Sequence, residues 1–123
     1  MDGSTYKDKT TFEHRLAESK KIKSKYPDRV PIIVEIYKNT LSFNKDYPQL
    51  DKNKYLVPVD LTMGQLLYVI RRRIKLGPEK AVFLQTSSGV MTPCSSLIGK
   101  IYNEYKDDDG FLYILLTFEN FFG

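Results

Sequence analysis

The 123-residue sequence predicts a single α+β domain in which a small mixed β-sheet wraps over one helix. Three observations lead to this fold. Runs of β-branched and aromatic residues at 30–37, 55–57, 81–85 and 111–118 have the composition of strands. Apolar residues at helical spacing separate the second run from the third and the third from the fourth. A chain of this length buries enough surface for one hydrophobic core.

An amphipathic helix is expected near the start of the chain, from Phe12 to Tyr26. Thr10 and Glu13 have the spacing of a capping box, and Pro27 disfavours helix at the residue before it. A shorter helical turn is expected at 4–9. Residues 1–29 hold eight Lys and Arg against five Asp and Glu, so this extension is basic and the remainder is nearly neutral. A solvated helix face explains this bias, and attraction to acidic partners is the functional alternative.

A polar loop separates the first two strands, and the long helix follows the second. We expect a strand at 30–37, a loop at 38–53 and a short strand at 55–57 that Pro58 ends, which places it at a sheet edge. Thr62 and Gln65 predict a second capping box. The helix is expected to continue to about Lys75, burying one apolar face and exposing three arginines. The apolar face comprises Leu66, Val69, Ile70 and Ile74, and the arginines are Arg71, Arg72 and Arg73.

The second half contains two further strands and a helix. Residues 81–85 predict a strand, and Val90-Met91 is interpreted as a brief strand after the turn at Gly89. A helix is expected from about Ser95 to Tyr105, with an apolar stripe of Leu97, Ile98, Ile101 and Tyr102. The final strand is expected at 111–118.

Gly123 ends the sequence after this strand, and we expect a flexible tail there. Glycine has no Cβ, so a terminal glycine carboxylate can enter a narrow enzyme tunnel. Small modifier proteins that are activated through their C-terminus need that geometry.

Three sequence blocks carry a family resemblance across nearly the whole chain. They are Lys54-Tyr55-Leu56-Val57-Pro58, Arg71-Arg72-Arg73 and Asp109-Gly110-Phe111-Leu112-Tyr113, with shorter matches at Phe12-Glu13, Arg29-Val30-Pro31 and Phe122-Gly123. The chain resembles the ubiquitin-like autophagy modifiers, which include autophagy-related protein 8, microtubule-associated light chain three and the GABA-receptor-associated protein. Two departures are a loop at 38–53 that is about five residues longer than usual and an altered turn at 91–95.

The resemblance implies a ubiquitin-like β-grasp fold with two extra N-terminal helices. The domain would consist of a helical extension at 1–27, a core at 28–118 and a flexible conjugation tail at 119–123 with Phe121, Phe122 and Gly123. It implies that an activating and a conjugating enzyme attach Gly123 to phosphatidylethanolamine, and that a cysteine protease deconjugates it. The protein would move from the cytoplasm to the autophagosomal membrane and would be a monomer.

The resemblance also implies a groove for receptors with an aromatic-x-x-aliphatic motif. Independently, an exposed edge at Lys54–Pro58 can accept an added peptide strand. The aromatic pocket would be lined by Glu18, Ile22, Pro31, Ile33, Lys54, Leu56 and Phe111. The aliphatic pocket would be lined by Tyr55, Val57, Pro58, Leu61, Leu66 and Val69. Arg29 and Arg73 would pair with acidic residues that flank the motif.

Other chemistry has weaker support, and we expect no enzyme, no metal site and no cofactor. His14 is the only histidine, and a dyad with Cys94 has no evident orienting group. The acidic loop at 107–110 does not have the alternate spacing that calcium needs. The basic residues at 20–25 and 71–73 come without a nucleic-acid reader motif. The alternative function is a non-covalent adaptor in vesicle trafficking or on microtubules. The lone Cys94 suits a reducing compartment, which favours the cytoplasm.

Overall fold

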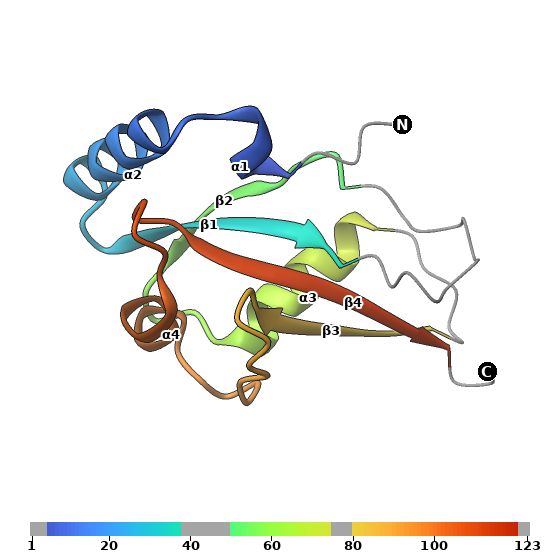
Figure 1. Cartoon of the computed structure of the whole chain (residues 1–123). Helices are drawn as coiled ribbons and strands as arrows, with labels where there is room; N and C mark the ends of the chain where they lie inside the picture. Colours follow the sequence, from blue (N-terminus) through green and yellow to red (C-terminus); the bar gives the residue numbers. More distant parts are fainter. Residues whose placement is uncertain (1–4, 38–49, 75–79, 121–123) are drawn as a thin grey trace.

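The computed structural model describes residues 5–37, 50–74 and 80–120, in an α+β arrangement around one mixed sheet (Figure 1). The elements in chain order are α1 (Tyr6–Lys9), α2 (Phe12–Lys25), β1 (Arg29–Ile36), β2 (Lys54–Pro58), α3 (Met63–Arg73), β3 (Lys80–Thr86), α4 (Ile98–Tyr105) and β4 (Leu112–Asn120). The strand order is β2-β1-β4-β3. The central pair β1–β4 is parallel, and both outer pairs are antiparallel. The predicted fold class and the position of β2 at an edge are therefore confirmed.

Alternation along β1 divides the interior into a large core and a small one, because successive strand residues face opposite sides of the sheet. Val30, Ile32 and Val34 join the large core with residues of α3 and α4. Ile33 belongs to a smaller cluster with Phe111 and Tyr113, against which side chains of α1 and α2 pack. In Figure 1, α1 and α2 accordingly lie over one face of the sheet, while α3 and α4 lie on the other.

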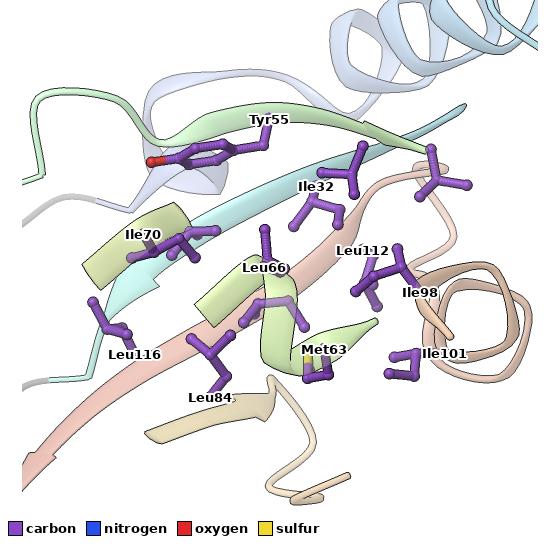
Figure 2. Packing of buried hydrophobic residues seen from close by; sticks show 14 of the residues in the cluster. Ile32, Tyr55, Met63, Leu66, Ile70, Leu84, Ile98, Ile101, Leu112 and Leu116 are labelled. Atoms are coloured by element: carbon purple, nitrogen blue, oxygen red, sulfur yellow. The ribbon is translucent and has the colours of Figure 1, made fainter. Parts of the chain in front are cut away.

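The large core collects apolar side chains from every strand and from both helices on its side (Figure 2). Leu66 and Ile70 of α3 project toward Ile32 of β1 and Leu116 of β4. These four side chains are each at most 1% exposed. Burying a side chain of this size contributes roughly 1.5–3 kcal/mol. These contacts hold α3 against one face of the sheet, and Tyr55 and Val57 of the edge strand β2 are buried in the same core.

Hydroxyl caps define the starts of three helices, and one predicted cap is displaced. Thr62 and Gln65 form the predicted capping box of α3. Thr5 and Asp8 form another at α1. At α2 the cap is Thr11, whose hydroxyl accepts a hydrogen bond from the backbone N–H of His14, so the assignment of Thr10 was wrong. Thr10 instead follows α1 as its C-cap, and its hydroxyl donates to the carbonyl of Tyr6, the first residue of that helix.

The segment between β3 and α4 differs from the sequence prediction. Val90 does not form a strand, because its backbone N–H and C=O both bond to Thr86 and close a tight turn. The helix begins at Ile98 rather than near Ser95. Residues 94 and 95 instead form a turn, and the carbonyls of Cys94 and Ser96 accept hydrogen bonds from the first two residues of α3. At the end of the sheet, β4 continues through Asn120, so two residues assigned to the tail pair with β3.

Candidate functional site

The outer edge of β2 has backbone groups that point away from the sheet. In an antiparallel pair, opposed residues alternate between those that exchange hydrogen bonds and those that do not. Val34 N–H donates to Asn53 C=O and Val59 N–H donates to Asp28 C=O. These bonds and the register show that the backbone N–H and C=O groups of residues 53, 55, 57 and 59 point toward β1. The N–H and C=O of Lys54 and Leu56 therefore face outward, where an added strand can bond to them.

The face of this edge on the α2 side contains the residues predicted for the aromatic pocket. Leu56 lies opposite Pro31 in the register, and Lys54 lies opposite Ile33. Ile22 of α2 packs against the small core formed by Ile33, Phe111 and Tyr113. Ile33 and Phe111 are 0% exposed, so they lie beneath this face rather than on it. The half-buried Leu56 and Ile22 are the apolar side chains that remain accessible.

A charged network stands beside these apolar residues. Lys54 Nζ lies 2.8 Å from Glu18 Oε2, and the Tyr6 hydroxyl donates to Glu18 Oε1 at 2.6 Å. Burial alone would raise the pKa of Glu18, but the hydrogen bonds from Lys54 and Tyr6 together lower it. Burial alone would lower the pKa of Lys54, yet its bonds to Glu18 and Tyr6 raise it. Both groups are therefore charged at neutral pH.

Tyr6 is a component of this face that the sequence analysis did not identify. Its ring packs edge-on against Phe111 with centroids 5.8 Å apart, and Lys54 Nζ lies 5.1 Å from its centroid. Its backbone N–H donates to Glu35 of β1 at 2.8 Å. The sequence did contain a signal for this role. Tyr6 is an aromatic residue directly after the Thr5 cap, so the short helix α1 holds it in place.

The residues predicted for the aliphatic pocket come from β2, from α3 and from the segment between them, and they differ in accessibility. Tyr55, Val57 and Leu66 are buried in the large core. Pro58 and Leu61 are half-buried. Val69 was expected to be buried by α3, but it is 44% exposed. Val69 lies beside the buried stripe of that helix, so it is suited to the rim of the predicted pocket rather than to its floor.

The predicted flanking arginines lie at opposite ends of β2. Arg73 Nη2 is 3.2 Å from Asp51 Oδ2, just before the strand begins. Arg29 is exposed and lies opposite Pro58, where the strand ends. The structure therefore does not bring the two guanidinium groups together. An incoming peptide that follows β2 would meet one arginine at each end.

A buried ion pair that the sequence did not reveal fixes α2 to the loop before β4. Arg15 Nε lies 2.8 Å from Asp109 Oδ2, and the Tyr113 hydroxyl donates to the same oxygen at 2.6 Å. Asp109 Oδ1 accepts from the backbone N–H of Phe111 at 2.9 Å. This network positions α2 relative to the sheet, and hence Glu18 and Ile22 relative to β2.

The tail of the predicted site and a possible membrane span are the remaining features to place. Phe121, Phe122 and Gly123 lie outside the residues that the structure describes. Across the described ranges, no helix is both long enough and apolar enough to cross a bilayer.

Comparison with known proteins connects this geometry to one family. The family model described as "Autophagy protein Atg8 ubiquitin like" matches residues 14–123. Autophagy-related protein 8 of Lodderomyces elongisporus is 52% identical over 120 residues, covering 98% of this chain and 78% of the relative. Autophagy-related protein 8a of Arabidopsis thaliana is 48% identical over 123 residues, covering 100% and 96%.

A solved structure supports the same relationship at the level of the fold. The chain superimposes on the crystal structure of Trypanosoma brucei ATG8 with a TM-score of 0.81 and 42% sequence identity. The match covers 99% of this chain and 100% of the other. The fold is therefore ubiquitin-like, with the N-terminal helices added to it. The chain belongs to the Atg8 family, whose members are non-enzymatic ubiquitin-like modifiers of autophagy.

Proposed function

We propose that this chain is conjugated through Gly123 to phosphatidylethanolamine on autophagosomal membranes and there recruits receptors through the edge of β2. Family membership implies partners in the autophagy conjugation system. The single observation that carries the receptor role is the outward-facing backbone of Lys54 and Leu56 between two different side-chain faces.

The geometry of an added strand explains why the motif is aromatic-x-x-aliphatic. Residues one and four of an extended peptide are an odd number of positions apart, so their side chains point to opposite faces of the sheet. The first would meet Leu56 and Ile22 on the α2 side. The fourth would meet Leu61 and Val69 on the α3 side. Main-chain hydrogen bonds to β2 would supply affinity, and the two faces would supply specificity.

The receptor role is tested by calorimetry with a synthetic aromatic-x-x-aliphatic peptide. Leu56→Ala removes an apolar contact, and Lys54→Ala removes a charge beside it. Each is expected to weaken binding by about tenfold, equivalent to about 1.4 kcal/mol. Lys100→Ala, on the exposed side of α4, is the matched control and should bind like wild type. Unchanged affinity in both edge variants, with circular dichroism showing folded protein, would remove the assignment.

The conjugation step follows from the chemistry of a terminal carboxylate. An activating enzyme would join the Gly123 carboxylate to AMP and release pyrophosphate from ATP. A thiol of the activating enzyme would displace AMP to form a thioester with Gly123. A thiol of the conjugating enzyme would then take over the Gly123 acyl group by thioester exchange and present it to the lipid. The amine of phosphatidylethanolamine would then attack the thioester, forming an amide and freeing the thiol. One lipid with two acyl chains suffices for stable anchoring.

The conjugation step is tested by mass spectrometry of membrane fractions from starved source cells. Wild type and Lys100→Ala are expected to carry a phosphatidylethanolamine adduct on Gly123, and Gly123→Ala is expected to have none. The deconjugating cysteine protease should remove the adduct by hydrolysing the amide. Absence of the adduct from wild type would contradict the proposal and favour a non-covalent adaptor.

A further inference from the structure

A basic groove between α2 and α4 lies outside the residues assigned to the β2 edge. Its volume is about 520 Å³, and its lining includes Leu16, Lys20, Lys23, Tyr102, Lys106 and Asp108. In Figure 1, α2 and α4 lie near the same end of the sheet, where β4 begins. The buried Tyr102 has a fixed position, because its hydroxyl donates to the Gly110 carbonyl at 2.6 Å.

Two ammonium groups converge on the Tyr102 ring from different helices. Lys23 Nζ of α2 lies 5.2 Å from the ring centroid, and Lys106 Nζ, just after α4, lies 5.7 Å from it. Lys23 Nζ also donates to the Arg29 carbonyl at 3.3 Å. An ammonium has three donors, so each of these groups can still bind an anion. Both cations therefore interact with a single ring of the groove lining.

The carboxylates near the groove do not neutralise these lysines. Asp107 is paired with Lys7, whose Nζ is 2.6 Å from Oδ1. Burial alone would raise the pKa of Asp107, but the hydrogen bonds from Lys7 and from the Asp109 backbone lower it. Among the described residues, no carboxylate lies within ion-pair distance of Lys20, Lys23 or Lys106. The lining then has three lysines against the one further carboxylate, Asp108, so the groove around Tyr102 has an excess of positive charge.

We propose that this groove binds an acidic peptide segment of a partner protein, at a second site separate from the β2 edge. Charge complementarity selects an anionic occupant. The choice of a peptide over a lipid surface rests on the proposed anchoring through the C-terminal tail. Gly110 lines the groove, whereas β4 runs from Leu112 to Asn120, roughly 26 Å of extended chain. A protein anchored at that far end holds the groove away from its own membrane.

The test uses a fluorescein-labelled decapeptide of alternating Glu and Ser, which has no aromatic or aliphatic residue for the β2 edge. Binding is measured by fluorescence anisotropy on the full chain. The double variant Lys23→Gln/Lys106→Gln is expected to weaken binding by about tenfold. The control Lys21→Gln/Lys25→Gln removes two exposed charges from α2 outside the groove. It is matched to the groove variant because Lys25 Nζ also lies over a tyrosine ring, 5.5 Å from the Tyr26 centroid. Its effect should stay below about threefold, because salt screens distant surface charges.

Amide shift mapping by NMR gives a second readout, independent of affinity. The peptide should shift the amides of Lys23, Asn103, Lys106 and Gly110 and leave those of Lys54 and Leu56 unchanged. Equal loss of affinity in the control, or shifts centred elsewhere, would overturn the proposal. So would groove-dependent binding to phosphatidylcholine vesicles containing phosphatidylserine, since a lipid surface would then be the occupant. Calorimetry with the aromatic-x-x-aliphatic peptide should give wild-type affinity for the groove variant, so failure of the groove is distinguishable from failure of the β2 edge.

Discussion

Replacing Arg15 with methionine should destabilise the domain far more than breaking a nearby exposed ion pair. The Arg15 side chain is 9% exposed and its partner Asp109 is 0% exposed. Methionine retains most of the aliphatic length of arginine but leaves the Asp109 carboxylate without its cation. Removing one partner of a buried pair costs about 3–5 kcal/mol.

The lower end of that range is expected, because two donors remain on Asp109. The Tyr113 hydroxyl and the Phe111 backbone N–H continue to bond to its carboxylate. A loss of about 3 kcal/mol in the free energy of unfolding would lower the melting temperature by roughly 12 °C in a domain of this size. Arg15 Nη1 also donates to the Thr10 carbonyl at 2.8 Å, so the connection between α1 and α2 is lost as well.

Urea denaturation followed by circular dichroism measures this effect. The control is Lys7→Met, which breaks the Lys7–Asp107 pair between the same extension and the same loop. That pair is more exposed, and exposed pairs contribute less than about 1 kcal/mol. Adding Asp109→Asn to Arg15→Met should recover roughly half of the loss, because the uncompensated charge is removed. A loss no larger than that of Lys7→Met, or no recovery in the double variant, would refute the reasoning.

Three further predictions concern stability and binding. Gly110→Ala and Gly89→Ala both place a side chain at a φ of 90°, but only at Gly110 would the new Cβ collide with α2, so its urea midpoint should fall further. The pKa of Glu18 is lowered in the folded protein, so its carboxylate contributes stability at pH values above the ordinary pKa of a glutamate, and this contribution is lost as the pH falls through the folded-state pKa. Glu18→Gln should therefore flatten the acid limb of a curve of unfolding free energy against pH. Leu66→Ala should cost about 2–5 kcal/mol in urea denaturation, whereas exposed Val69→Ala should lower mainly peptide affinity in calorimetry.

The elements that could be predicted from sequence depend on residues close together in the chain. The capping box of Thr62 and Gln65 spans one turn of helix, so both of its hydrogen bonds are local. The edge position of β2 followed from Pro58, which lacks the N–H that a central strand needs. The sheet order did not follow from local pattern. It required the parallel pairing of β1 with β4, which are separated by most of the domain.

The side chains that position the candidate site were harder to predict, because their partners are distant in sequence. Arg15 and Asp109 are 94 residues apart, and each resembles an ordinary surface charge when considered alone. Val69 shows a different limit. At 100° per residue it lies about 90° around α3 from the centre of the stripe formed by Met63, Leu66 and Ile70. Residues at that angle are buried or exposed according to what packs beside the helix.

Backbone hydrogen exchange at the β2 edge tests the central claim most directly. Exchange rates of the four amides from Lys54 to Val57 are measured by NMR with and without an aromatic-x-x-aliphatic peptide. Tyr55 and Val57 face β1, so their amides should exchange slowly in both states. Lys54 and Leu56 face outward, and the amide of Leu56 in particular should become protected when the peptide adds as a strand. Tight binding of the peptide without protection at Leu56 would contradict the account.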